Sequence, residues 1–363
     1  MKPLKLKTFL SDEGFGHIVR QRAIIEALKI HMPELSVLLQ TERHIEAAGR
    51  LIKGVDTNKK YNNITWHKQP NGSPDVDLIK IEYAQYLKRS EDYIHQELEE
   101  WDNHDFIISD FVYEAFPLAK KKGIPSFGVA HFTWDWFFSK LYPPPLKTEV
   151  IYRFFEMAKM ATALYFPPFT PEEILKYYKA NAKQVPLILR SEINHKPSGS
   201  KDKFKVMIMD SGAGVLRRSI LKALDSIADL DDFQFFVSSN MHRAQSNISF
   251  IDKNELMVDY INEMDLVIGR AGFNTISECI GLRTPMLLIG EAMNPEMNEN
   301  ILNLKKVGLG SFISIETFEN DLRHFLPLFL QHEYNFISQN MKDHELAVNG
   351  AEVIALDILD RIS

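Results

Sequence analysis

A short glycine-containing turn, Arg270-Ala271-Gly272, follows the apolar run Asp265–Ile268 and precedes a helical pattern. At the start of a helix the first backbone N–H groups lack partners within the helix, and the helix dipole favours an anion beside them. The turn can therefore hold a phosphate group. An ordinary strand-to-helix turn of an α/β protein explains the same residues equally well, so this segment by itself leaves both interpretations open.

A histidine and an aspartate stand at the ends of two other apolar runs. His17 ends the segment SDEGFGH, which follows Leu6–Leu10 and contains Gly14 and Gly16, and Asp110 ends the run DFIISD. Glycines let the backbone approach a ligand closely. A carboxylate bonded to one imidazole nitrogen fixes the tautomer and leaves the other nitrogen to take a proton. The pair is a candidate general base. A locally bonded histidine and an N-cap aspartate for the following helix are the alternative interpretations.

The elements that must position these residues alternate short apolar runs with helical patterns, which is typical of parallel α/β layers. We interpret the polar segment 195–203, HKPSGSKDK, as the linker between two such units. We expect strands in the first unit near Leu6–Leu10, Ser36–Gln40, Ile64–His67, Asp105–Asp110, Pro125–Ala130, Ala163–Phe166 and Val185–Leu189. We expect strands in the second unit near Phe204–Met209, Phe233–Val237, Ile248–Ile251, Asp265–Ile268, Pro285–Ile289 and Gly310–Ile313.

The predicted fold is α/β, with two doubly wound Rossmann-like domains facing across a cleft. We expect an N-terminal domain over 1–196, a C-terminal domain over 197–345, and a helix over 346–363 that packs back on the first domain. Ligands of such sheets sit beyond the carboxyl ends of the strands, where the strand order reverses. In the usual order this point lies between the first and fourth strands. It brings His17 toward Asp110.

The composition limits the class of protein. The chain is 45% hydrophobic and 25% charged, as expected of a folded globular protein, and its net charge of −7 argues against a nucleic-acid partner, which needs a basic face. One cysteine, Cys279, excludes an internal disulfide and suits a reducing compartment. Histidines without metal spacing predict no metal site. No run of the sequence reaches the length of a membrane span, and we expect a cytoplasmic location.

The second half of the chain resembles the donor-nucleotide domain of GT-B glycosyltransferases, especially relatives of the bacterial lipid II N-acetylglucosaminyltransferase and the UDP-glycosyltransferases. Positions that fall on the family pattern are Ala271, Gly272, Thr275, Glu278, Pro285, Glu296, Asn300 and Gly308. The chain departs from the pattern at Arg283, where a glycine is usual, and at Met297, where a glutamine is usual. GFGH with Arg20 resembles the acceptor-side glycine loop of these enzymes. Residues 109–138 resemble the glycosyltransferase-like region of plant L-arabinokinases.

This resemblance implies a nucleotide-sugar donor, expected to be a UDP-sugar, and no separate cofactor. Glu278 would bind the ribose hydroxyls. The loops Gly212–Gly214 and Ala271–Thr275 would hold the diphosphate. The donor-nucleotide site would comprise Gly212, Ala213, Gly214, Arg270, Ala271, Gly272, Asn274, Thr275 and Glu278. The donor sugar would meet Glu296, Met297 and Asn300. His17 would be the general base and Asp110 its partner.

The aromatic stretch 131–138, HFTWDWFF, follows the fifth expected strand. Its rings can stack on a sugar or lipid acceptor or pack against the helix over 149–160, and we expect packing for most of them. The acceptor side is assigned to Gly14, Gly16, His131, Trp134 and Asp135. The acceptor is expected to be a small molecule, a glycan or a lipid-linked compound, so peripheral membrane contact is compatible with the sequence.

The leading functional prediction is an inverting glycosyltransferase of glycan or cell-envelope biosynthesis. A nucleotide-sugar 2-epimerase is the second hypothesis, because such enzymes share the two-domain fold and also cleave the anomeric bond. It needs carboxylates near the sugar, for which Asp110 and Glu296 are the candidates. A nucleotide-sugar sensor without activity is the third hypothesis, because Met297 cannot usefully bond a sugar hydroxyl.

Overall fold

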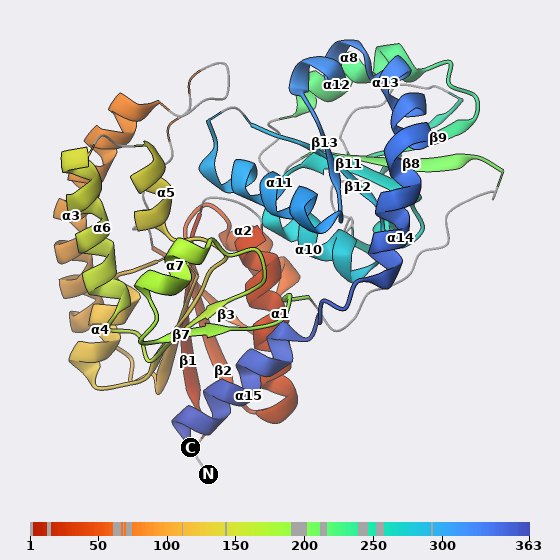
Figure 1. Cartoon of the computed structure of the whole chain (residues 1–363). Helices are drawn as coiled ribbons and strands as arrows, with labels where there is room; N and C mark the ends of the chain where they lie inside the picture. Colours follow the sequence, from red (N-terminus) through yellow and green to blue (C-terminus); the bar gives the residue numbers. More distant parts are fainter. Residues whose placement is uncertain are drawn as a thin grey trace. The chain divides into compact units, whose positions relative to one another are not determined.

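The computed structural model describes residues 3–12, 16–60, 67, 69, 75–110, 112–141, 144–189, 202–210, 216–238, 246–251, 258–291 and 293–363. The chain divides into two compact units (Figure 1). The first unit contains Met1–Ser191 together with Ala347–Ser363, and the second contains Glu192–Leu346. The last helix therefore belongs to the unit that holds the first strand.

The first unit is a seven-stranded parallel sheet covered by helices, with the strand order β3-β2-β1-β4-β5-β6-β7. Its strands are β1 (Lys5–Leu10), β2 (Ser36–Thr41), β3 (Asp56–Lys59), β4 (Phe106–Asp110), β5 (Ser126–Val129), β6 (Ala163–Phe166) and β7 (Ala182–Gln184). Its helices are α1 (Gly16–His31), α2 (Ile45–Leu51), α3 (Val76–Glu99), α4 (Ala115–Lys122), α5 (Trp134–Leu141), α6 (Pro144–Ala158), α7 (Glu172–Tyr177) and α15 (Gly350–Ile362). The strand order reverses between β1 and β4, as predicted.

The second unit is a six-stranded parallel sheet with the order β10-β9-β8-β11-β12-β13. Its strands are β8 (Phe204–Met209), β9 (Phe233–Ser238), β10 (Ile248–Ile251), β11 (Leu266–Arg270), β12 (Met286–Ile289) and β13 (Ser311–Ile313). Its helices are α8 (Arg217–Ile227), α9 (Val258–Ile261), α10 (Phe273–Gly281), α11 (Pro295–Val307), α12 (Ile315–Asn320), α13 (Leu322–Phe329), the π-helix η1 (Leu330–Tyr334) and α14 (Asn335–Asp343). The predicted fold class of two doubly wound parallel-sheet domains is confirmed.

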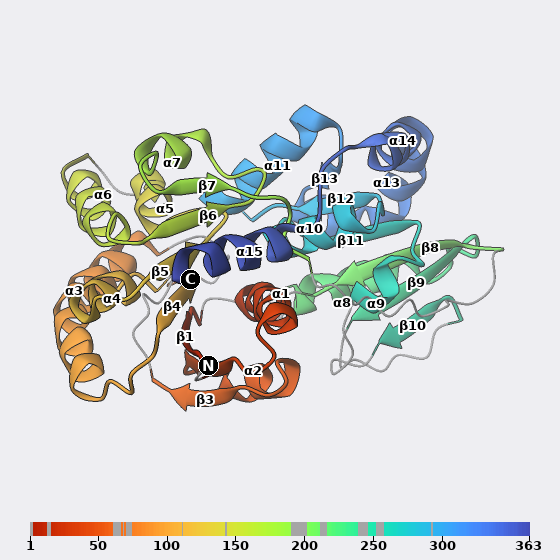
Figure 2. The same cartoon turned by 90° about the horizontal axis from the view of Figure 1, so that it is seen from below.

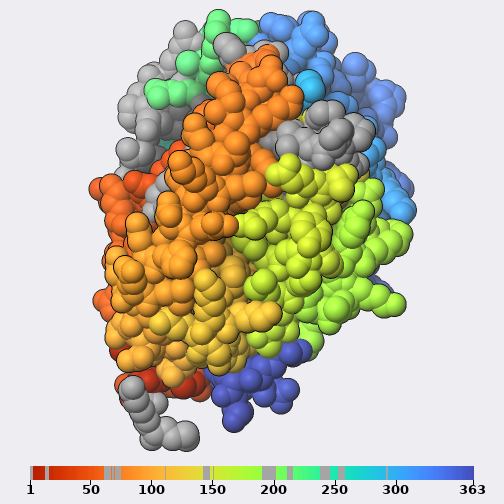
Figure 3. Space-filling model, turned by 90° about the vertical axis from the view of Figure 1, so that its left-hand side faces the viewer, coloured from red at the N-terminus to blue at the C-terminus, as the bar shows by residue number. Residues whose placement is uncertain are grey.

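Apolar residues cover both faces of the first sheet, which is why its central strands read as nearly continuous apolar runs. All five residues of β4 are buried. On one face α1 and α15 lie side by side and share one hydrophobic core (Figure 2). The other face carries an aromatic cluster from α3, α5 and α6, and the outer surface of α3 and α6 is seen in Figure 3. These two hydrophobic cores, one on each face, fix the position of the sheet and thus of the carboxyl ends of β1 and β4.

The helix α15 is fastened to the first unit through backbone contacts. The Leu187 N–H donates to the Ala347 carbonyl at 3.0 Å, and the Gly350 N–H donates to the Leu187 carbonyl at 2.9 Å. A Cβ atom at Gly350 would lie 2.2 Å from the Pro186 carbonyl oxygen. Only a glycine therefore allows the chain to approach this closely as it enters α15.

Two edge strands lie away from the apolar runs that predicted them. The strand beside β2 is Asp56–Lys59, a polar segment, and of the predicted run 64–67 only His67 lies within the described residues. The last strand is Ala182–Gln184 rather than the predicted Val185–Leu189, and Ile188 instead forms an isolated bridge with Asn349. Val185 and Ile188 of the predicted run are buried because they belong to the hydrophobic core that α15 covers. Burial there comes from the helix and not from membership of the sheet.

None of the helices in the described ranges is long and apolar enough to cross a membrane. Within the same ranges no group of three or more histidine, cysteine, aspartate or glutamate side chains is arranged to hold a metal ion.

Candidate active site

Four buried polar side chains meet where β1 and β4 end: His17, Arg20, Asp110 and His131. His17 Nδ1 lies 2.8 Å from Asp110 Oδ1. Arg20 donates from Nε to Asp110 Oδ2 at 2.8 Å and from a terminal nitrogen to Oδ1 at 2.5 Å. Its other terminal nitrogen lies 3.1 Å from His131 Nδ1. The predicted meeting of His17 and Asp110 is thus present in the structure.

The sequence brings this cluster together through register and helix periodicity. Leu10 pairs with Asp110 between β1 and β4, and the Ser11 N–H donates to the Asp110 carbonyl at 3.0 Å. Because α1 begins at Gly16, His17 lies in its first turn. Arg20 is three residues further on and shares the same helix face. Gly16 lies at the helix start, while Gly14 is outside the described residues.

The charges of the cluster fix the state of its carboxylate. Burial alone would raise the pKa of Asp110, but the Arg20 guanidinium and then His17 lower that pKa well below its usual range. Although Asp110 is fully buried, this lowered pKa keeps it ionised, and it accepts from the His17 Nδ1–H group. The alternative of an N-cap role is wrong for Asp110, because α4 begins at Ala115 with Glu114 at its N-cap.

A second buried aspartate, Asp12, ties the β1–α1 loop to the β2–α2 loop. Asp12 Oδ1 accepts from Thr41 Oγ1 at 2.5 Å and from the backbone N–H groups of Glu42 and Arg43 at 3.1 and 3.0 Å. His44 Nε2 lies 3.0 Å from the Asp12 carbonyl oxygen. Asp12 was not among the predicted site residues, although its position soon after a strand at the switch point could have indicated it.

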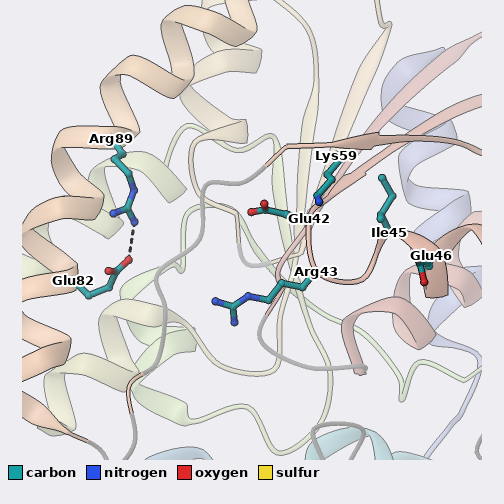
Figure 4. A pocket seen from close by; sticks show the side chains of 7 residues that line it. All are labelled: Glu42, Arg43, Ile45, Glu46, Lys59, Glu82 and Arg89. Carbon is teal, nitrogen blue, oxygen red and sulfur yellow. Dashed lines mark hydrogen bonds and ion pairs between the residues drawn. The ribbon is translucent and has the colours of Figure 1, made fainter.

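A charged hollow of about 630 Å³ opens beside the β2–α2 loop of the first unit (Figure 4). Its volume lies within the range of about 300–1,000 Å³ typical of small-molecule pockets. It is lined by Glu42, Arg43, Ile45, Glu46, Lys59, Glu82 and Arg89. Arg89 pairs with Glu82 at 2.7 Å, and Ile45 is the one apolar residue among those that line the hollow. No sequence pattern predicts this surface, because its residues come from three separate segments.

Two residues assigned to the acceptor side lie in the core. Trp134 is 5% exposed, and its ring stacks on Phe138 with centroids 5.4 Å apart. Asp135 is 2% exposed and accepts a hydrogen bond of 2.8 Å from the Tyr178 hydroxyl. Both side chains pack within the aromatic cluster of the first unit. Stacking on an acceptor would require Trp134 to leave that cluster. His131, also assigned to the acceptor side, belongs instead to the polar cluster at the carboxyl ends of β1 and β4.

The burial of Asp135 makes the stability of the first unit depend on pH. Burial raises the pKa of Asp135 to about 6, and the Tyr178 bond opposes this only in part. An acid with a raised pKa contributes stability that is fully present below its unfolded pKa, near 3.9, and is lost as the pH rises through 6. Asp135→Asn keeps the acceptor oxygen but has no charge to bury.

We therefore expect the free energy of unfolding of Asp135→Asn, taken relative to that of wild type, to be about 2 kcal/mol higher at pH 7 than at pH 4.5. Urea unfolding at both pH values measures this change. Asp77→Asn, at a carboxylate whose side chain is 92% exposed, is the matched control and should show no such change. A constant difference between wild type and Asp135→Asn across this range would contradict the burial argument.

In the second unit, the Arg-Ala-Gly turn leads from β11 into α10 as expected. Gly272 occupies the N-cap position of α10 without a side-chain cap. A Cβ atom added to Gly272 meets no heavy atom within 4 Å in the described part of the chain, so close packing within that part does not require a glycine at this position. Asn274, Thr275 and Glu278 are half-buried on α10. The predicted second loop, 212–214, lies outside the described residues.

The residues assigned to the donor sugar have different surroundings. Asn300 is buried, and its side-chain amide donates to the Ala271 carbonyl at 2.9 Å, so it holds the turn itself. Met297 is 4% exposed, with its sulfur 3.9 Å from the Arg270 guanidinium. Glu296 lies half-buried in the first turn of α11. Of these three, Glu296 is the residue whose position suits contact with a ligand.

Arg270 is held by Glu291, which Asn294 holds in turn, and neither of these two residues was among the predicted site residues. Glu291 Oε2 accepts from Arg270 and from the Asn294 side-chain amide, both at 2.8 Å. Asn294 is also the N-cap of α11, because its Oδ1 accepts from the Met297 N–H at 3.2 Å. The Asn294-Pro295 pair is a standard helix-start signature and could have located this end of the site.

Comparison with known proteins matches residues 227–355 to the glycosyltransferase family 28 C-terminal domain. A UDP-N-acetylglucosamine–N-acetylmuramyl-(pentapeptide) pyrophosphoryl-undecaprenol N-acetylglucosamine transferase from Oceanobacillus iheyensis is 27% identical over 192 residues, covering 51% of each chain. The enzyme of that name from Thermosipho africanus is 30% identical over 127 residues, covering 33% of this chain and 37% of the relative. The chain spans about half the length of the curated relatives it matches, or less.

Solved structures share the fold over nearly the whole chain. The glycotransferase of kitacinnamycin has a TM-score of 0.70 at 14% identity, covering 100% of both chains. The Acinetobacter baumannii protein MurG has a TM-score of 0.61 at 15% identity, covering 99% of this chain and 100% of that structure. At these identities the likeness concerns the fold alone.

Proposed function

We propose that this chain, which belongs to the GT-B glycosyltransferases, transfers a sugar from a nucleotide sugar to a hydroxyl acceptor. The observation that carries the proposal is the buried His17–Asp110 pair, 2.8 Å apart, at the switch point of the first sheet. The match of residues 227–355 to a glycosyltransferase C-terminal domain supports the same activity. The curated relatives are named for a UDP-N-acetylglucosamine donor, which supports a UDP-sugar here.

The proposed reaction is a single displacement with inversion at the anomeric carbon. Asp110 accepts from His17 Nδ1, so His17 Nε2 takes the proton of the acceptor hydroxyl. The acceptor oxygen then bonds to the anomeric carbon as the bond between that carbon and the diphosphate oxygen breaks. The nucleoside diphosphate leaves with the electron pair. The backbone N–H groups and the helix dipole at the start of α10 stabilise its charge.

We place part of the acceptor-binding site in the charged hollow of the first unit. Six of the seven residues that line it are charged, and an apolar acceptor would remove those charges from water without replacing their hydrogen bonds. We therefore propose an acceptor with a polar or charged part bound beside Arg43 and Lys59. The curated relatives are named for a lipid-linked pyrophosphoryl acceptor, which is one compound of this kind. A cytoplasmic location belongs to the proposal as well.

The activity is tested by incubating the whole chain with UDP-N-acetylglucosamine, with and without a panel of polar hydroxyl acceptors. Acceptor-dependent release of UDP with a glycosylated product supports transfer. Conversion of the donor to its 2-epimer without acceptor would establish the epimerase hypothesis instead. Tight nucleotide binding with neither reaction, across several UDP-sugars, would establish the sensor hypothesis.

Glu278 provides a test of the donor site. It lies five residues after the start of α10, or about 7.5 Å along the helix axis at about 1.5 Å per residue. A diphosphate at the helix start would bring the ribose toward this carboxylate, which can accept from both ribose hydroxyls. We expect Glu278→Ala to weaken UDP binding by about 10- to 150-fold, from about 1.5–3 kcal/mol for a charge-assisted contact.

Calorimetric titration with UDP and with its 2′,3′-dideoxy analogue measures this contact. Glu278→Ala should weaken binding of the analogue far less, because the analogue lacks both hydroxyls. Glu316→Ala, at an exposed glutamate in the first turn of α12, is the control and should leave both affinities unchanged. Equal losses for the two ligands would exclude contact between Glu278 and the ribose.

A further inference from the structure

Arg20 is the centre of the polar cluster in the first unit. Its side chain is 3% exposed and contacts three other members of the cluster. It binds both oxygens of Asp110, lies 3.1 Å from His131 Nδ1, and lies 3.3 Å from His17 Nδ1. Gln21 adds a further donor to Asp110 at 3.4 Å. One guanidinium group therefore touches both imidazole rings.

The chemistry of the guanidinium group decides where the His131 proton lies. Arginine has five N–H donors, no acceptor, and remains charged in proteins. A hydrogen bond from Arg20 to His131 Nδ1 requires a lone pair on that nitrogen. The imidazole must then be neutral, with its one proton on Nε2. His131 Nε2 is consequently a hydrogen-bond donor.

The same rule gives the opposite result for His17. Its Nδ1 lies 2.8 Å from Asp110 Oδ1, and an ionised carboxylate only accepts. Nδ1 must carry the proton, so the 3.3 Å approach of Arg20 to this atom joins two donors and is not a hydrogen bond. The shorter bond to the carboxylate decides the tautomer. His17 Nε2 is thus an acceptor, and the two rings present opposite polarity.

We propose that Arg20 is a positioning residue that holds His131 as a neutral, Nε2-protonated donor beside the base His17. The role of His131 in recognising the acceptor, described next, rests on the proposed transferase function. A fitting acceptor presents the reacting hydroxyl to His17 Nε2 and a second oxygen with a lone pair, such as another hydroxyl or a carbonyl, to His131 Nε2–H. Polyhydroxylated and acylated sugars have this arrangement, whereas a simple alkyl alcohol does not.

The tautomers can be measured without turnover, so the test is independent of the transferase proposal. Long-range proton–nitrogen correlation spectra of the whole chain, labelled with ¹⁵N-histidine, separate Nδ1–H, Nε2–H and imidazolium rings among its 12 histidines. Spectra of His17→Gln and His131→Gln assign the two signals. At pH 8 we expect the Nδ1–H pattern for His17 and the Nε2–H pattern for His131.

Arg20→Lys tests whether the arginine causes this arrangement. Lysine keeps the positive charge next to Asp110, which favours folding, but one ammonium group cannot reproduce the planar fork that reaches both Asp110 and His131. The His131 signal should change from a single Nε2–H pattern to an average of the two tautomers, while His17 keeps its Nδ1–H pattern through Asp110. Arg22→Lys is the matched control, because Arg22 lies on the same helix and pairs with Glu26 at 2.6 Å.

Three results would overturn the proposal. The first is a proton on His131 Nδ1 in the wild-type protein, and the second is an imidazolium pattern for His131 at pH 8. The third is an unchanged His131 pattern in Arg20→Lys that still folds by circular dichroism. If the tautomers are as expected but no sugar is transferred, the proposed function fails while the positioning role of Arg20 stands.

Discussion

Replacement of His17 by alanine is expected to lower kcat by about 10²–10⁴-fold, the usual contribution of a general base. The acceptor hydroxyl then has to lose its proton to water, because Nε2 is gone and Asp110 is buried. Affinity for the nucleotide should change little, since the proposed donor site lies in the second unit. Steady-state rates with UDP-N-acetylglucosamine and an identified acceptor, together with UDP titration, measure both quantities.

The matched control for this experiment is His31→Ala. His31 ends the same helix, and its partly exposed Nε2 lies 2.8 Å from Glu352 Oε1, a surface contact that is expected to contribute little. Turnover in His31→Ala should equal that of the wild-type protein. Unchanged turnover in a folded His17→Ala variant would remove His17 from the mechanism and leave the base unidentified.

Asp110→Asn is expected to lower the free energy of unfolding by about 3–5 kcal/mol, as for other buried ion pairs that lose one partner. The asparagine leaves the Arg20 guanidinium buried without its countercharge, and its NH₂ group is a donor that replaces one of the two carboxylate oxygens that accept from Arg20. Urea unfolding at pH 7 measures the loss. Asp92→Asn, at an exposed position of α3, should change stability by less than about 0.5 kcal/mol.

The pH dependence of this difference has a defined sign. Because its folded pKa is lowered, Asp110 contributes stability that is present above the unfolded pKa, near 3.9, and is lost as the pH falls toward the folded value. The advantage of wild type over Asp110→Asn should therefore shrink below about pH 4. An advantage that grows on acidification would contradict the ion-pair explanation.

The sequence predicted the central part of the fold well, because buried parallel strands are apolar on both faces. β1, β4, β8 and β11 were all found near their apolar runs. The edge strands of the first sheet were predicted wrongly, because β3 is polar and the apolar run 185–189 is buried by α15, whereas the edge strands β10 and β13 of the second sheet lie on their predicted runs. The apolar pattern of a sequence indicates which side chains are buried. A run buried by a helix distant in sequence shows the same pattern as a run buried within a sheet.

In the candidate site, too, the features set by strand order could be predicted, whereas the local side-chain contacts could not. Strand order alone brought His17 to Asp110, because the switch point of a doubly wound sheet is fixed by topology. The surroundings of Trp134, Met297 and Asn300 depend on packing between elements, which no spacing pattern reveals. Asn300 illustrates the difference, since no pattern predicted that its side-chain amide donates to the Ala271 carbonyl.

The return of α15 to the first unit has a consequence for synthesis on the ribosome. The first unit requires Ala347–Ser363, so its hydrophobic core stays open while the entire second unit is translated. At about 5–20 residues per second, the interval between Ser191 and Gly350 lasts roughly 8–30 s. The apolar face of α1 remains uncovered during that time, with Ile24 and Leu28 among its residues. We therefore expect the nascent chain to expose this apolar face until α15 emerges, so that the second unit can fold before the first unit is complete.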